Sequence, residues 1–143
     1  QHLPFARRSS GTLPAAETRV WLGDSMGEMP AYFATADIVL MGGTFLPFGG
    51  QNLIEAAACG CPVLVGPHTY NFAQATEDAL ACGAARRVEN AEAAAKEAAH
   101  LMADRTILDG MRAAAGEFSQ AHRGATARTL ALIQASMATR TAG

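Results

Sequence analysis

The sequence is poor in charged and aromatic residues, and it has no long apolar run. Only 17% of its 143 residues are charged and 6% are aromatic, and the formal net charge is -2. Arginine and lysine form no cluster, so nucleic-acid binding is not expected. No apolar run approaches the roughly 20 residues that span a bilayer. With half of its residues hydrophobic, the composition is typical of a soluble globular domain.

Cysteine is scarce, and its three copies lack a metal-binding spacing. Cys59, Cys61 and Cys82 form no CxxC motif and lie among alanine and valine. An odd number of cysteines in apolar surroundings indicates reduced core thiols in a cytoplasmic protein rather than a disulfide framework. The four histidines are scattered along the chain. We therefore expect no zinc or iron centre, no other metal site and no cofactor.

The length and the first residues bear on the domain organisation. A chain of 143 residues is ordinarily one domain, large enough to bury a real core. It begins at Gln1-His2-Leu3 without an initiator methionine, and residues 3–8 already have the composition of a strand. We therefore expect the chain to be a fragment of a longer protein.

Apolar runs alternate with helix signals along most of the chain. Strands are expected at residues 3–8, 19–23, 37–41, 62–66 and 85–88, and helices from 25 onward and at 53–59, 72–82, 90–103, 105–120 and 124–138. This alternation predicts an α/β protein whose parallel sheet carries helices on both faces. Ligands bind such sheets beyond the carboxyl ends of the strands, where the loops 23–28, 42–52 and 66–71 lie.

The most informative stretch is residues 42–55, which read as a glycine-rich loop followed by a helix start. Glycine pairs at 42–43 and 49–50 allow the backbone to approach other backbone or a ligand closely. Asn52 is a good N-cap, and Glu55 three residues later completes a capping-box pattern. Free N–H groups and the helix dipole at such a start suit a phosphate. An ordinary capped turn is the alternative interpretation.

A second helix start follows the strand expected at 19–23. Ser25 and Glu28 form another capping-box pattern, and a proline at position 30 is tolerated in the first helical turn. An ordinary helix cap without any part in ligand binding is one interpretation of this pattern. Trp21 and Phe33, on the strand and on the helix, are expected in the core. Asp24 is expected to shape the turn, as is Asn71 in a later loop.

Four motifs resemble the C-terminal half of the 3-deoxy-D-manno-octulosonic acid (Kdo) transferases. They are LGDSMGEM at 22–29, GGT at 42–44, GGQNLIE at 49–55 and PVLVGPHTYNF at 62–72. Their order and spacing match that family over residues 19–83. The resemblance implies a two-domain GT-B glycosyltransferase, with residues 1–143 as its Rossmann-like, C-terminal nucleotide-sugar-binding domain. The C-terminal helices, at about 105–138, would belong to this domain.

The resemblance also implies an activity for the full-length protein. Such enzymes transfer Kdo from CMP-Kdo to the lipid A precursor in lipopolysaccharide biosynthesis, on the cytoplasmic face of the bacterial inner membrane. In that family the catalytic carboxylate, the acceptor site and the membrane-associating surface belong to the N-terminal domain. No catalytic residue is therefore expected in this chain, and the fragment alone is expected to be soluble and inactive.

The family's CMP contacts correspond to two segments of this sequence. The residues concerned are Met26, Gly27, Glu28, Asn52, Leu53, Ile54 and Glu55. Glu55 is expected to accept hydrogen bonds from ribose hydroxyls, because its charge would repel the phosphate. Backbone groups at 26–28 are expected to read the cytosine edge, with the Met26 side chain against the ring.

Other loop residues depart from the family pattern or admit two roles. Pro47 and Phe48 stand where the family commonly has a Glu-Arg pair, and Gln51 stands in place of a histidine, so this loop is more apolar. His68 could bind phosphate or donor sugar, or it could be structural. Two other classes also fit the pattern: a UDP-sugar-binding GT-B transferase or epimerase, and a non-catalytic module that binds a nucleotide or a partner.

Overall fold

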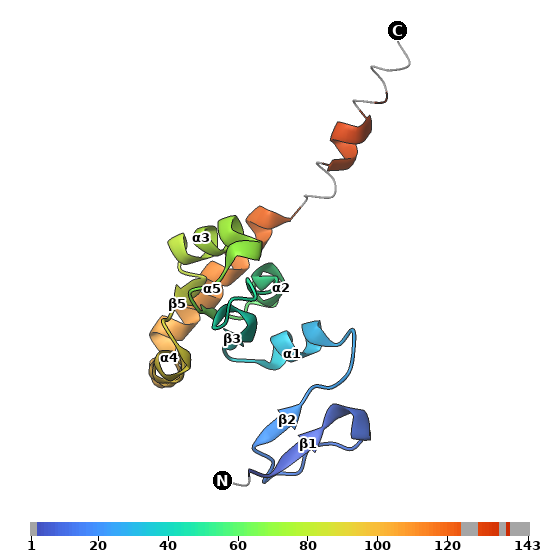
Figure 1. Cartoon of the computed structure of the whole chain (residues 1–143), viewed down its shortest axis with the longest axis vertical. Helices are drawn as coiled ribbons and strands as arrows, with labels where there is room; N and C mark the ends of the chain where they lie inside the picture. Colours follow the sequence, from blue (N-terminus) through green and yellow to red (C-terminus); the bar gives the residue numbers. More distant parts are fainter. Residues whose placement is uncertain (1–2, 124–128, 135–136, 138–143) are drawn as a thin grey trace. The chain divides into compact units, whose positions relative to one another are not determined.

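The computed structural model describes residues 3–123, 129–134 and 137. The chain divides into two compact units, Gln1–Tyr32 and Phe33–Gly143, whose elements are labelled in Figure 1. None of the described helices has both the length and the apolar character needed to cross a membrane.

The first unit is built on two short strands. β1 (Phe5–Arg7) and β2 (Val20–Leu22) pair in parallel as a two-stranded sheet. A single 3-10 turn, η1 (Arg8–Ser10), follows β1. The helix α1 (Met29–Thr35) begins in this unit, so the loop 23–28 joins the carboxyl end of β2 to a helix, as predicted.

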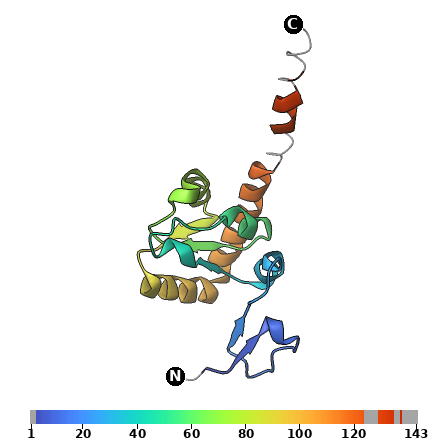
Figure 2. The same cartoon turned by 45° about the vertical axis from the view of Figure 1, so that its right-hand side comes forward.

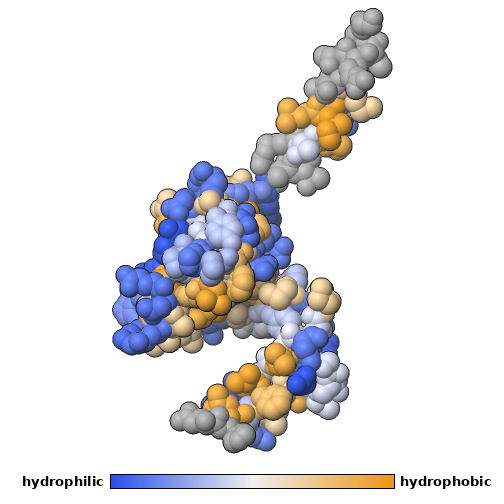
Figure 3. All heavy atoms as spheres, in the orientation of Figure 1, coloured by the Kyte–Doolittle hydropathy of each residue, from blue (hydrophilic) through white to orange (hydrophobic). Residues whose placement is uncertain are grey.

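The two-stranded sheet carries exposed apolar side chains, which appear as orange spheres in Figure 3. Trp21 is 44% exposed, so the prediction that it lies in the core is wrong. Its ring makes an edge contact with Tyr32 at a centroid distance of 5.8 Å. A two-stranded ribbon has too little area to enclose its own large side chains. Phe33, by contrast, is buried, as predicted.

The second unit holds a three-stranded parallel sheet in the order β3–β4–β5. Its strands are β3 (Val39–Met41), β4 (Val63–Val65) and β5 (Ala85–Arg87). Its helices are α2 (Leu53–Ala58), α3 (Ala73–Ala81), α4 (Ala91–Ala103) and α5 (Arg105–His122), and its 3-10 turns are η2 (Gly42–Thr44) and η3 (Tyr70–Phe72). Figure 2 shows α3 and α4 on opposite sides of the strands.

Strand β4 is central and is buried on both faces. Val63 and Val65 join a core cluster with side chains of α2, α3 and α5. Leu64 packs on the other side with Leu101 of α4 and Leu108 of α5. Because alternate residues of a strand point to opposite faces, helices cover both faces of this sheet, as predicted. Helix α5 contributes to both clusters.

The predicted strands and helices agree with the structure, but their pairing differs in one respect. We expected one sheet, whereas the hydrogen bonds form two, β1–β2 and β3–β4–β5. Hydrophobic pattern identifies strands but does not specify which strands are neighbours. In the helix predicted at 124–138, residues 129–134 and 137 are helical, and the other positions lie outside the described residues.

The structure describes all three cysteines and shows no disulfide among them, and only Cys61 lies in the core. Cys61 is buried, and its burial raises the pKa of the thiol to about 11. Cys59 and Cys82 are exposed, so the core prediction is wrong for both. Each follows the last helical residue of its helix, α2 or α3, where the chain turns outward at a glycine of positive φ, Gly60 or Gly83.

Candidate nucleotide-binding loops

The loops after β3 and β4 are joined at their base by one buried side chain. Thr44 is 1% exposed. Its Oγ1 donates to the carbonyl oxygen of Met41 at 2.5 Å and accepts from the backbone N–H of Gly66 at 2.6 Å. Its own carbonyl oxygen accepts from the N–H of His68 at 3.0 Å. The two loops that were predicted to share the carboxyl edge of the sheet therefore contact each other directly.

A second set of bonds joins the tips of the same loops. The Tyr70 hydroxyl donates to the carbonyl oxygen of Pro47 at 2.6 Å, and the Asn71 amide Nδ2 donates to that of Phe48 at 3.0 Å. The backbone N–H of Asn71 donates to the carbonyl oxygen of Gly49 at 3.1 Å. Asn71 thus does more than shape its own turn, because it holds a loop 23 positions away.

The glycine pairs do bring backbone against backbone, as predicted. The N–H of Gly50 donates to the carbonyl oxygen of Gly43 at 3.2 Å. Gly49 has a φ of +84°, and a Cβ there would lie 2.5 Å from side-chain atoms of both Tyr70 and Asn71. Glycine at 49 is therefore required by conformation and by space. Nothing lies within 4 Å of a Cβ built on Gly42.

The start of α2 confirms the predicted N-cap. The Asn52 side-chain oxygen accepts from the N–H of Ile54 at 3.2 Å. The Asn52 amide Nδ2 donates to Glu55 Oε1 at 3.0 Å, so the two predicted polar residues contact each other through their side chains. Glu55 is exposed. The side chains of Leu53, 2% exposed, and of Ile54 pack in the core instead, which leaves them only backbone groups to offer a ligand.

The loop 23–28 of the first unit is held through Glu28. Ser25 Oγ donates to Glu28 Oε2, and Arg8 Nη2 donates to Glu28 Oε1 at 2.8 Å. Ser25 Oγ also shares a hydrogen bond of 3.2 Å with the Tyr32 hydroxyl. Helix α1 begins at Met29, so Ser25 contacts Glu28 as predicted but lies too far upstream to cap the helix.

The predicted site residues of this loop differ in their surroundings. Met26 is 96% exposed, and Gly27 has a φ of +79°. Both Glu28 carboxylate oxygens are engaged by protein groups. The structure therefore places Met26 at the surface and gives Glu28 a role in holding the loop. These residues lie in the first unit, whereas the Asn52–Glu55 pair lies in the second.

Asp24 also ties its loop to a distant segment. It accepts from the N–H of Ser9 at 2.9 Å and from the Ser9 hydroxyl at 2.7 Å, and it lies 3.7 Å from Arg7 Nη1. The hydrogen bonds from Ser9 hold the pKa of Asp24 below its usual value, and those from Ser25 and Arg8 lower the pKa of Glu28. The prediction that Asp24 shapes its turn did not include these contacts, which depend on the pairing of β1 with β2.

These lowered pKa values predict an acid sensitivity of the first unit. The stabilisation is complete above the ordinary values, 3.8 for Asp24 and 4.5 for Glu28. It is lost as the pH falls through the lower folded values, because the unfolded state then binds more protons. Near-UV circular dichroism of Trp21, the single tryptophan, should show this loss. Glu28→Gln should flatten the profile, and Glu92→Gln in α4 should leave it unchanged. A wild-type signal that stays constant to pH 2 would contradict the assignment.

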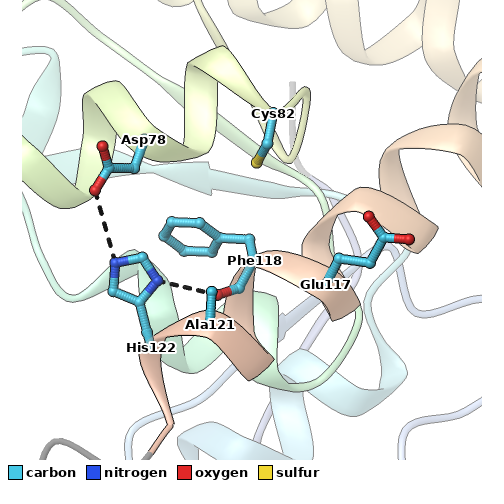
Figure 4. A pocket seen from close by; sticks show the side chains of 6 residues that line it. All are labelled: Asp78, Cys82, Glu117, Phe118, Ala121 and His122. Atoms are coloured by element: carbon cyan, nitrogen blue, oxygen red, sulfur yellow. Dashed lines mark hydrogen bonds and ion pairs between the residues drawn. The ribbon is translucent and has the colours of Figure 1, made fainter.

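A pocket of about 380 Å³ lies between α3 and α5, away from the predicted site residues (Figure 4). It is lined by Asp78, Cys82, Glu117, Phe118, Ala121 and His122. His122 Nε2 lies 3.8 Å from Asp78 Oδ2, and its Nδ1 is hydrogen-bonded to the carbonyl oxygen of Phe118 at 3.0 Å. Among the described residues, no group of three or more His, Cys, Asp or Glu side chains is arranged to hold a metal ion.

Comparison with known proteins places this fold and these loops in a family. The family model for glycosyl transferases group 1 matches residues 7–121. The chain belongs to this family. The match takes in both candidate segments, and it confirms the α/β glycosyltransferase class that the sequence predicts.

Curated relatives include 3-deoxy-D-manno-octulosonic acid transferases from several bacteria. That of Bordetella pertussis is 49% identical over 133 residues, which is 92% of this chain and 31% of that protein. That of Haemophilus influenzae is 46% identical over 68 residues, which is 48% of this chain and 16% of that protein. The resemblance to Kdo transferases is thereby confirmed. The chain spans about a third or less of the length of these relatives.

A solved structure shares the fold of this chain. The crystal structure of the C-terminal CMP-Kdo binding domain of WaaA from Acinetobacter baumannii aligns with a TM-score of 0.78 and 28% sequence identity. The alignment covers 82% of this chain and 62% of that chain.

Proposed function

We propose that this chain is the donor-binding part of a Kdo transferase and that it binds the CMP portion of CMP-Kdo. The observation that carries the proposal is the likeness, at 28% identity and a TM-score of 0.78, to a domain named for CMP-Kdo binding. The 49% identity to the Bordetella pertussis transferase supports the same donor. Residues 1–143 would then be the C-terminal nucleotide-sugar-binding domain.

In the second unit, Asn52 and Glu55 are the proposed side-chain ligands of CMP. They stand at the carboxyl end of β3, beyond a loop whose shape is held by the bonds of Thr44, Tyr70 and Asn71. The exposed Glu55 carboxylate has one oxygen on Asn52 Nδ2, and its other oxygen would accept hydrogen bonds from ribose hydroxyls. The backbone N–H of Leu53 at the helix start would face the phosphate, for which the helix dipole is favourable. The N–H of Ile54 would have to exchange its bond to the Asn52 side-chain oxygen for one to the phosphate.

In the first unit, the proposed contacts to the base are backbone groups of the loop 23–28. The exposed Met26 side chain offers an apolar surface for the cytosine ring, and Gly27 takes the positive φ that the loop requires. Glu28 holds this loop through Ser25 and Arg8. We assign it to shaping the loop rather than to direct contact through its carboxylate.

The remaining parts of the reaction are assigned to the protein beyond this chain. Transfer to the lipid A precursor needs a base that takes the proton of the acceptor hydroxyl, and a two-domain site forms only when the domains close over the nucleotide. We assign the catalytic carboxylate, the acceptor site and the association with the inner membrane, on its cytoplasmic face, to the N-terminal part of the full-length enzyme. The isolated chain is expected to bind CMP and to transfer nothing.

Nucleotide preference tests the proposed donor. CMP, UMP and UDP-GlcNAc are titrated into the isotope-labelled chain, and binding is followed by NMR shifts and by calorimetry. We expect CMP to bind in preference to the other two and to shift the amides of residues 26–28 and 52–55. A preference for UDP-GlcNAc would favour the alternative of a UDP-sugar enzyme. Binding of none of them, or sugar transfer by the isolated chain, would overturn the proposal.

The role of Glu55 predicts a specific loss of affinity. Glu55→Ala removes a charged hydrogen-bond acceptor from the proposed ribose contact, and we expect the CMP dissociation constant to rise about tenfold to a hundredfold. Glu92→Ala is the matched control, because Glu92 is also exposed and also lies in the first turn of its helix, α4. Equal affinity of the two variants for CMP would remove Glu55 from the site.

A further inference from the structure

Thr44 is a buried polar residue that the sequence comparison with Kdo transferases left without a role. It is followed by an exposed apolar loop and lies eight residues before Asn52. Its hydroxyl is hydrogen-bonded on both sides, to the Met41 carbonyl oxygen and to the Gly66 N–H. The residue therefore belongs to both of the loops that leave the carboxyl ends of β3 and β4.

Further contacts of Thr44 extend along both of these loops. Its carbonyl oxygen holds the N–H of His68. Its methyl group lies 3.0 Å from the position that a Cβ on Gly50 would occupy, and Gly50 is two residues before the cap of α2. A Cβ on Gly66 would lie 2.5 Å from the Thr44 carbonyl oxygen. The two loops therefore approach so closely that a side chain at position 66 has no room.

We infer that Thr44 is a positioning residue that makes the loops 42–52 and 66–71 move as one body, and that this coupling holds Asn52 and Glu55 in register with His68 for nucleotide binding. The second part rests on the proposed function, since it requires that CMP binds at these loops. The coupling of the loops does not. Loss of the hydroxyl leaves the Gly66 N–H buried without its partner, which favours opening of the junction.

Two substitutions separate the hydroxyl from the methyl group. Thr44→Val keeps the shape and removes the hydrogen bonds, whereas Thr44→Ser keeps the hydroxyl and removes the methyl group. Thr76→Val is the matched control, since Thr76 is equally buried but lies on α3. Hydrogen exchange of backbone amides and CMP titration are measured on the whole chain for all three variants and the wild type.

We expect Thr44→Val to speed exchange at Gly50, Gly66, His68 and Asn71 together, by roughly tenfold or more. We also expect it to weaken CMP binding by roughly tenfold, the scale on which supporting hydrogen bonds affect a site. Thr44→Ser should restore most of both, and Thr76→Val should change neither.

Several results would overturn the inference. The first is that Thr44→Val speeds amide exchange at Gly66 alone. The second is that Thr44→Val opens the loops and leaves the affinity for CMP unchanged. The third is that Thr76→Val loses as much exchange protection and CMP affinity as Thr44→Val. If the wild type binds no CMP, the proposed donor fails, and the coupling of the loops is then judged by exchange alone.

Discussion

Gly66→Ala is expected to lower the free energy of unfolding of the second unit by about 3 kcal/mol, at the upper end of the usual cost of overpacking. The new Cβ would lie 2.5 Å from the carbonyl oxygen of Thr44 and 2.7 Å from its carbonyl carbon. These are backbone atoms, so no side chain can rotate away to relieve the clash. The loops after β3 and β4 would have to separate, and the hydrogen bond from the Gly66 N–H to Thr44 Oγ1 would be lost.

Urea denaturation followed by far-UV circular dichroism measures this loss. Gly42→Ala is the control, because a Cβ there meets nothing within 4 Å. Its effect should stay within about 1 kcal/mol and could be a small gain, since alanine reduces the freedom of the unfolded chain. Equal midpoints for the two variants would show that the loops do not approach as closely as the structure has them.

Leu53→Ala is expected to destabilise the second unit by about 2–5 kcal/mol, the range for a buried leucine cut back to alanine. Leu53 is the first residue of α2 and packs in the core cluster beside β4. A cavity there would also loosen the start of the helix that carries Asn52 and Glu55. Packing of the Leu53 side chain in the core therefore stabilises the helix start that carries the candidate site residues.

A comparison of stability with binding tests this assignment. Leu40→Ala on β3 is the control, because Leu40 is 46% exposed and its loss should cost less than about 1 kcal/mol. Leu53→Met should keep both stability and CMP affinity, since it conserves volume. A Leu53→Ala variant as stable as wild type but unable to bind CMP would contradict the core assignment and place this side chain on the ligand.

The elements of the fold were predictable because each has a local signal. The cap of α2 at Asn52 was identified from residue type and spacing, and the structure confirms it through the hydrogen bond from the Ile54 N–H. The strand expected at 62–66 was identified as an apolar run, and β4 (Val63–Val65) lies within it. Such signals lie within one stretch of chain, so they can be recognised without knowledge of the fold.

The long-range contacts of the loops were not predictable in the same way. Arg8 on Glu28 and Asn71 on Phe48 join residues 20 and 23 positions apart, and their partners follow from strand pairing rather than from local pattern. Thr44 had one available signal, a polar residue in the glycine-rich loop that follows a predicted strand, but its hydrogen bond to Gly66 depends on how β3 and β4 align. The failure at Trp21 has the same origin, because exposure depended on which strands paired.

The position of α5 constrains the order in which the second unit can acquire its structure during synthesis. Strands β3 and β4 emerge from the ribosome well before α5, which is the last of the elements that complete the two core clusters. Until residues 105–122 are available, both valine- and leucine-bearing faces of β4 lack part of their cover. During this interval the nascent chain would expose apolar side chains of a nearly complete sheet. Chaperones that bind exposed apolar segments would recognise it in this state.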